Sequence, residues 1–128
     1  MKTITISAQG ISMSAELNDS SSAQQIWDAL PLEGSASTWG DEIYFATSVV
    51  MEEEPDASAD VEVGDLGYWP PGHALCIFFG PTPASTAKKP RAASPVNILG
   101  HVMGDARQFR IVQNGTTVRV DRSEKVQP

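Results

Sequence analysis

Apolar and polar residues alternate along most of this chain, which is the pattern of strands that bury one face. Residues 3–6 and 11–17 alternate in this way on either side of Ala8-Gln9-Gly10, so we predict an antiparallel hairpin at the N-terminus. The same period predicts further strands over residues 35–39, 42–47, 60–63, 75–79, 96–103, 109–113 and 116–121.

One segment has the period of a helix instead. An apolar stripe at positions i, i+3, i+4 and i+7 is formed by Ala23, Ile26, Trp27 and Leu30. Either Ser21 or Ser22, each followed three residues later by a glutamine, fits a capping box at the helix start. Pro31 cannot continue the helix and is expected to end it.

The predicted strands and single helix imply a mainly β fold. Residues 75–79 are apolar at every position, so this strand should be central and covered on both faces. A chain of eight or nine short strands either packs two sheets or closes into a barrel, and closure removes exposed edges. We expect an eight-stranded closed β-barrel with the helix capping one end.

The C-terminal part of the chain carries the strongest local turn signal. Asn114-Gly115 lies between the alternating segments 109–113 and 116–121, and both residues accept the positive φ of a type I′ turn. We therefore predict a second hairpin there. Residues 105–108 are expected to form one helical turn before it.

The length of 128 residues indicates a single domain, which we place over residues 1–122. Residues 123–128 are expected to be a frayed tail. Two long loops are predicted, an acidic one over residues 51–59 and one rich in Ala, Ser and Pro over residues 84–95. Loops of this length inside a compact domain are either functional or mobile.

Composition and charge exclude several classes of function. The net charge of −7 argues against nucleic acid as a partner, since that affinity comes from basic side chains. No apolar run reaches the length of a membrane span, and the N-terminus does not resemble a signal peptide, so we predict a cytoplasmic protein without a membrane partner. The acidic run around residues 52–54 lacks the ligand spacing of a calcium loop, and no zinc motif is present. We expect neither metal nor cofactor.

The chain resembles the cyclophilin-like domain proteins, small bacterial and archaeal proteins of unassigned function. The resemblance rests on an aromatic and glycine-rich signature over residues 38–45, 63–72, 74–83 and 97–100. It implies a closed eight-stranded β-barrel with helical caps. The catalytic run of true cyclophilins, Phe-Met-x-Gln-Gly-Gly-Asp, is absent, and Ile77 stands where their aromatic strand has glutamine. The resemblance therefore favours a protein that is not an enzyme.

The candidate site residues are aromatic side chains of this signature and the polar groups near them. We predict a ligand-binding patch whose aromatic members are Trp39, Tyr44, Tyr68, Trp69 and Phe79. Glu42 shares a strand face with Tyr44, and Thr82 follows a stiff Gly-Pro exit. Arg91 and Asn97 are the expected polar anchors, because a guanidinium clamps anions and an amide binds polar groups.

Each of these residues also has a structural interpretation. Trp69 could plug one end of the barrel, and one of Phe78 and Phe79 must face the core. Glu42 and Tyr44 could form a solvated face, Arg91 a solvated loop residue, and Asn97 could bind backbone groups at a bulge.

We predict a module that binds a small molecule or a short peptide, with no catalytic residue assigned. One alternative is a divergent peptidyl-prolyl isomerase in which Arg91 donates a hydrogen bond to the X-Pro bond. Another is a protein–protein interaction module that presents the aromatic patch. The oligomeric state is left open.

Overall fold

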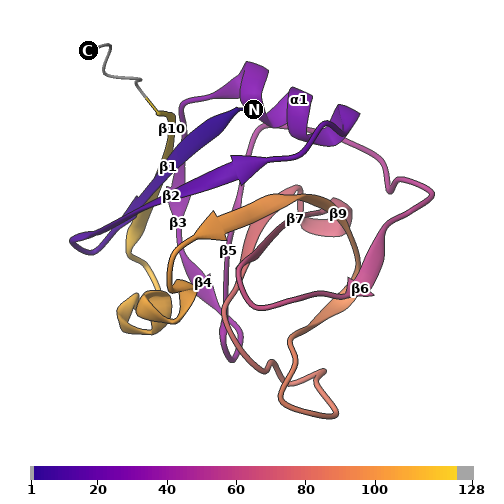
Figure 1. Ribbon diagram of the computed structural model, residues 1–128, viewed down its shortest axis with the longest axis vertical. Coiled ribbons are helices and arrows are strands. Elements are labelled where there is room, and N and C mark those ends of the chain that lie inside the picture. Colours follow the sequence, from indigo (N-terminus) through magenta and orange to yellow (C-terminus); the bar gives the residue numbers. More distant parts are fainter. Residues whose placement is uncertain (1, 124–128) are drawn as a thin grey trace.

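The computed structural model describes residues 2–123, which form a strongly curved β-sheet with one α-helix (Figure 1). The elements in chain order are β1 (Thr3–Ala8), β2 (Ile11–Leu17), α1 (Ser21–Ala29), β3 (Leu32–Ser35), β4 (Ser37–Thr38), β5 (Glu42–Ala46), β6 (Ser58–Asp60), β7 (Asp65–Trp69), a 3-10 helix (Pro70–Gly72), β8 (Ala74–Phe78), β9 (Arg91–Met103), a 3-10 helix (Ala106–Ile111) and β10 (Thr117–Arg122).

The sheet is antiparallel, with the strand order β3-β10-β1-β2-β9-β7-β8-β5-β4 and β6 paired to β9 outside this path. Its two edge strands, β3 and β4, are consecutive in the chain and are separated by Ala36 alone. In the described part of the chain, β3 and β4 are not paired with each other by backbone hydrogen bonds. The mainly β fold is confirmed. The closed eight-stranded barrel is not confirmed, since residues 2–123 contain ten strands, of which nine form an open path and β6 pairs outside it.

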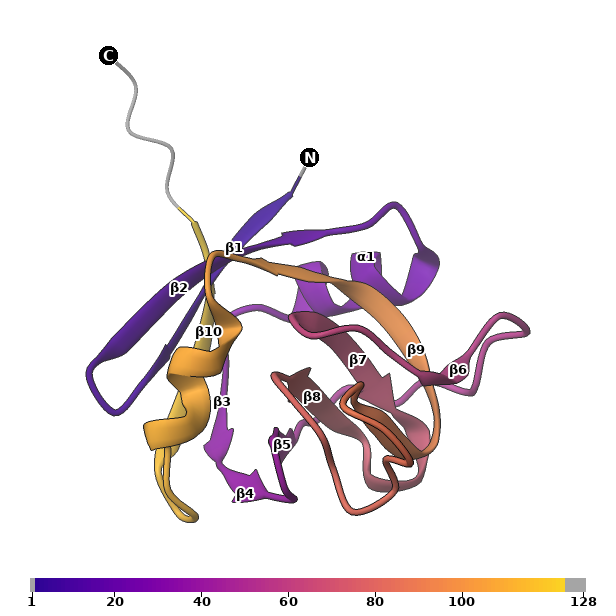
Figure 2. The same cartoon turned by 60° about the horizontal axis from the view of Figure 1, so that its bottom comes forward.

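The helix α1 lies over one end of the curved sheet, as Figure 2 shows. It starts after Ser20, whose side chain accepts a hydrogen bond from the backbone N–H of Ala23. The helix is confirmed, but its cap is Ser20 rather than Ser21 or Ser22. The backbone becomes extended at Leu30, just before Pro31.

Two hydrophobic clusters lie on opposite faces of β5 and β8. The main core contains Ile43 and Phe45 from β5 together with Leu75 and Ile77 from β8. The other face of β8 contributes Ala74, Cys76 and Phe78 to a smaller cluster with Val61, Ala92 and Val96. Every residue of β8 is buried, which confirms the prediction of a central strand covered on both sides.

The N-terminal hairpin is confirmed, with β1 and β2 paired from Thr3 opposite Glu16 to Ala8 opposite Ile11. The prediction of a C-terminal hairpin is wrong. Residues 106–111 form a 3-10 helix that buries Ala106 and Phe109, so Asn114-Gly115 links a helix to β10. The side chain of Asn114 instead accepts hydrogen bonds from the backbone N–H and the hydroxyl of Thr38.

Three further segments differ from the sequence prediction. Residues 65–69, which include Gly67, form β7, where no strand was predicted. The strand predicted over residues 60–63 lies earlier, as β6 over Ser58–Asp60. The last part of the predicted loop 84–95, from Arg91 onward, belongs to β9. The long loop before it ends at Pro90.

The ends of the described chain lie side by side. Ser123 donates its backbone N–H to the carbonyl oxygen of Thr3 and shares a hydrogen bond between its hydroxyl and that of Thr5. The first residue of the predicted frayed tail is therefore bound to β1, and residues 124–128 lie outside the described residues. No helix within residues 2–123 has the length and apolar character needed to cross a membrane.

Candidate functional site

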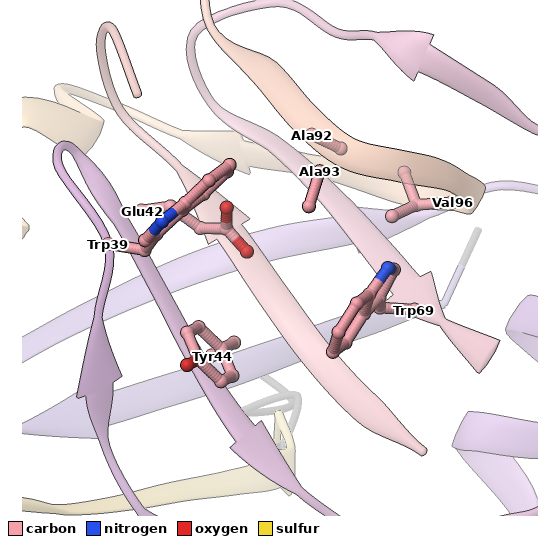
Figure 3. Close-up of a pocket in the computed structure, with 7 residues that line it drawn as sticks. All are labelled: Trp39, Glu42, Tyr44, Trp69, Ala92, Ala93 and Val96. Carbon is pink, nitrogen blue, oxygen red and sulfur yellow. The ribbon is translucent and has the colours of Figure 1, made fainter. Parts of the chain in front are cut away.

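A pocket of about 210 Å³ opens on the face of β5 that points away from the main core (Figure 3). We call it the aromatic pocket; it is lined by Trp39, Glu42, Tyr44, Trp69, Ala92, Ala93 and Val96. In Figure 3 the indoles of Trp39 and Trp69 lie on opposite sides, and the carboxyl group of Glu42 points into the space between them. The first half of β9 covers the pocket with small side chains.

The turn between β4 and β5 positions Trp39 and Glu42. The backbone N–H of Trp39 donates to the carbonyl oxygen of Glu42, which closes the turn. Gly40 has a φ of +61°, and a Cβ there would lie 2.9 Å from the Cα of Thr82. Only glycine combines this backbone conformation with so close a neighbour. Gly40 of the signature is thus a structural requirement of the turn that carries two pocket residues.

Trp69 is held in place from the other side of the pocket. Its indole N–H donates a hydrogen bond of 2.7 Å to the hydroxyl of Ser94 on β9. Its ring lies edge-on to Tyr44, with the ring centroids 6.4 Å apart and the planes at 66°. Because two contacts fix the ring, this wall of the pocket is formed before any ligand arrives.

Glu42 is the ionisable acid of the pocket and is only 6% exposed. Burial disfavours its charged form and raises the pKa of Glu42 from 4.5 to about 7, although the neighbouring thiol of Cys76 acts in the opposite direction. The pKa of that thiol is itself raised, first by burial and then by the nearby carboxyl group of Glu42. Cys76 is therefore a neutral thiol at neutral pH, and it donates to the carbonyl oxygen of Ala74 at 3.8 Å.

This arrangement has a definite chemical capacity. A carboxyl group whose pKa lies near 7 exists in both protonation states at neutral pH, so it can donate a hydrogen bond, accept one, or carry a negative charge. The surrounding aromatic and aliphatic side chains would contact an apolar ligand body. In residues 2–123, no group of three His, Cys, Asp or Glu side chains is placed to hold a metal ion.

Trp39, Glu42, Tyr44 and Trp69, four of the predicted site residues, meet in the aromatic pocket, whereas Tyr68, Phe79 and Thr82 do not line it. Tyr68 is fully buried, and its hydroxyl donates to the carbonyl oxygen of Val49. Phe79 is 2% exposed and packs in the main core, against Phe109. The hydroxyl of Thr82 donates to the carbonyl oxygen of Arg91, so this residue fixes the start of β9.

The two expected polar anchors, Arg91 and Asn97, also do not line the pocket and contact other groups instead. Arg91 forms an exposed ion pair with Asp60 of β6. Asn97 is fully buried, and its oxygen accepts a hydrogen bond of 2.8 Å from the backbone N–H of Glu54. Its amide nitrogen donates to the carbonyl oxygen of Glu52 at 2.9 Å. Asn97 thus binds the backbone of the acidic loop.

Ala92, Ala93 and Val96 were not predicted as lining residues. The first two lie in the segment predicted to be a loop, and alanine carries no chemical signal of its own. In the structure, exposed Arg91 is followed by buried Ala92, as in a strand that buries one face. The Pro and Ser residues around them are typical of a loop, so the strand was not predicted. The proximity of Cys76 to Glu42 depends on the pairing of β5 with β8, which the sequence pattern did not specify.

Comparison with known proteins supports the fold. A family model described as "Cyclophilin-like" matches residues 2–121. The solution structure of the hypothetical protein AF2241 from Archaeoglobus fulgidus is 38% identical, with a TM-score of 0.81 over 95% of each chain. The structure of McbB in complex with tryptophan is 17% identical, with a TM-score of 0.72 over 98% of this chain and 46% of that chain. No curated protein matches the chain.

Proposed function

The chain belongs to the cyclophilin-like family, and from this premise we propose that it binds a small molecule in the aromatic pocket. The observation that carries the proposal is the placement of one buried carboxyl group, that of Glu42, between the indoles of Trp39 and Trp69. Burying a carboxyl group without a charged partner costs free energy. The position of this group at a pocket therefore favours a role in binding a ligand.

The pocket volume limits the size of the ligand. The volume of about 210 Å³ is below the ~300–1,000 Å³ of sites for drug-sized molecules. We therefore expect a small metabolite, or a single side chain of a short peptide, rather than an extended ligand. McbB, of which this chain covers 46%, was solved in complex with tryptophan, a small molecule.

A ligand-observed NMR screen tests the proposal. Small cationic, anionic and neutral compounds would be screened against the wild type and against Ala93→Phe, which places a ring in the pocket from an exposed position. Ala46→Phe is the matched control, because Ala46 is also an exposed strand alanine and does not line the pocket. We expect hits that Ala93→Phe abolishes and Ala46→Phe retains. A screen without such hits would overturn the proposal.

The isomerase alternative has less support. It requires the guanidinium of Arg91 to be available for an X-Pro bond, but this group is paired with Asp60. The interaction module remains a separate prediction, which size-exclusion chromatography over a range of concentrations would test. The cytoplasmic location expected from the sequence is likewise a prediction.

We also propose that the sheet behaves as a barrel although its edges are not paired. Ala36, which links the edge strands β3 and β4, donates its backbone N–H to Thr116 and accepts from Gly115. These bonds hold the link against the segment before β10. The chain itself would then bridge the two edges of the sheet, which would keep the aromatic pocket rigid.

A further inference from the structure

We propose that the ligand of the aromatic pocket is a small organic ammonium ion, held against the rings of Trp39, Tyr44 and Trp69 beside the carboxylate of Glu42. This inference rests on the proposed function, because it names the chemical class of ligand for the same site. It follows from the shape of the pocket, the distribution of charge around it and the protonation chemistry of its acid.

The first argument is the arrangement of the rings. An ammonium group is attracted to the face of an aromatic ring within about 6 Å of its centroid, and tryptophan gives the strongest interaction. Tyr44 and Trp69 meet at 66° with their centroids 6.4 Å apart, and Trp39 lies on the opposite side. Rings set at an angle around a space offer a cation more than one surface. The hydrogen bond from Trp69 to Ser94 reduces the entropy lost when a ligand binds.

The second argument is charge. Among the lining residues, all of which lie in the described range, Glu42 carries the only carboxyl group and no basic side chain is present. Arg91 at the start of β9 is paired with Asp60, and Lys89 just before this strand is paired with Glu62. The chain as a whole has a net charge of −7, which attracts cations and repels anions. A carboxylate or phosphate ligand would meet no complementary charge here.

The third argument concerns protonation. Without a ligand, burial holds the pKa of Glu42 at about 7. A cation beside it would favour the ionised form, so binding at lower pH must release a proton. Cys76 of β8 faces this carboxyl group, and Tyr44 lies on the same strand. The neighbouring Asp41 is paired with Arg110, while Arg91 is paired with Asp60.

Calorimetric titration with two probes of the same shape tests the inference. Choline carries a quaternary ammonium, and its uncharged analogue has carbon in place of the nitrogen. Butylammonium is added as a primary amine. Wild type, Glu42→Gln and Glu53→Gln would be titrated at pH 6 and pH 8. Glu53 is an exposed acid of the same chain and serves as the matched control.

We expect at least one ammonium probe to bind the wild type about tenfold more tightly than the uncharged analogue. Its affinity should rise about tenfold from pH 6 to pH 8, as a Glu42 with a pKa of about 7 becomes ionised. Glu42→Gln should lose both effects, and Glu53→Gln should retain both.

The failures of the two proposals are distinguishable. If the uncharged analogue or an anionic compound binds as well as the ammonium probes, and Ala93→Phe abolishes that binding, the ligand class is wrong while the pocket remains a binding site. If ammonium binding is independent of Glu42 and of pH, the inference is overturned. If no compound binds in a manner that depends on Ala93, both proposals fall.

Discussion

The indole N–H of Trp69 donates a hydrogen bond of 2.7 Å to the hydroxyl of Ser94, and this bond joins β7 to β9 beside the aromatic pocket. The bond fixes the orientation of one pocket wall. It also leaves the ring free to contact a ligand, because the polar atom of the indole is already satisfied.

Replacing Ser94 by alanine should therefore loosen Trp69. We expect the free energy of unfolding to fall by about 1 kcal/mol, the usual value of one neutral hydrogen bond. Urea denaturation measures the loss, and a shift of the tryptophan emission reports the change around the ring. Ser14→Ala, at an exposed position in β2, is the control and should change neither quantity. Equal effects of the two substitutions would show that the Trp69–Ser94 bond is not stabilising.

Glu42 should make the stability of the protein depend on pH in a specific direction. Its pKa is about 7 in the folded chain against an ordinary value of 4.5, so between these values the native state binds more protons than the unfolded state. The free energy of unfolding should therefore fall as the pH rises from 4.5 to 7 and then level off. The contribution is at most about 3 kcal/mol.

The substitution Glu42→Gln should remove this component. The stability of the variant relative to wild type should be higher at pH 8 than at pH 4, as measured by urea denaturation at each pH. The difference between the two proteins cancels the contribution of other acids, including Asp65, whose pKa is also raised, mainly by burial. Parallel curves for wild type and variant across this range would contradict the placement of Glu42.

Asn97 should be important for stability rather than for ligand binding. Asn97→Ala leaves the backbone N–H of Glu54 and the carbonyl oxygen of Glu52 without their partners, and we expect a loss of about 3 kcal/mol. Asn114→Ala is a comparison at an exposed position and should cost about 1 kcal/mol or less. Hydrogen exchange at the amide of Glu54 should accelerate only in the first variant. A stable Asn97→Ala protein with altered ligand affinity would reverse the assignment.

Arg91 provides a test of the isomerase alternative. A protease-coupled assay on an X-Pro peptide should show no rate that depends on Arg91, because the guanidinium is paired with Asp60 at the surface. Since exposed ion pairs contribute little, Arg91→Ala should change the free energy of unfolding by less than about 1 kcal/mol. Catalysis that Arg91→Ala abolishes would restore the enzyme hypothesis.

The elements that the sequence predicted correctly are those in which one pattern was unopposed. The N-terminal hairpin, the helix and the apolar strand β8 each had a single period and clear ends. Residues 106–112 were compatible with two periods. Phe109 and Ile111 fit the alternation of a strand, whereas Ala106, Phe109 and Val112 recur every third residue, and tertiary packing selected the 3-10 helix that buries them.

The missed strand β7 has a similar physical explanation. Gly67 interrupts the alternation that predicts a strand, but it lets β9 approach, because a Cβ at this position would lie 2.8 Å from a methyl group of Val96. Part of the site was accessible from the sequence, since Glu42 and Tyr44 share a strand face and Trp69 belongs to the aromatic signature. The burial that sets the pKa of Glu42 was not accessible, because it depends on the path of β9 over the sheet.

The three tryptophans allow the most direct test of the central claim, that the aromatic pocket is the ligand site. Trp39 and Trp69 line the pocket, whereas Trp27 lies on α1 under the guanidinium of Arg122. Their indole N–H signals can be followed by ¹⁵N NMR while choline or butylammonium is added. We predict that the signals of Trp39 and Trp69 shift with one common affinity and that the signal of Trp27 does not move. If a saturating ligand shifted Trp27 and left the other two unchanged, the account would be contradicted.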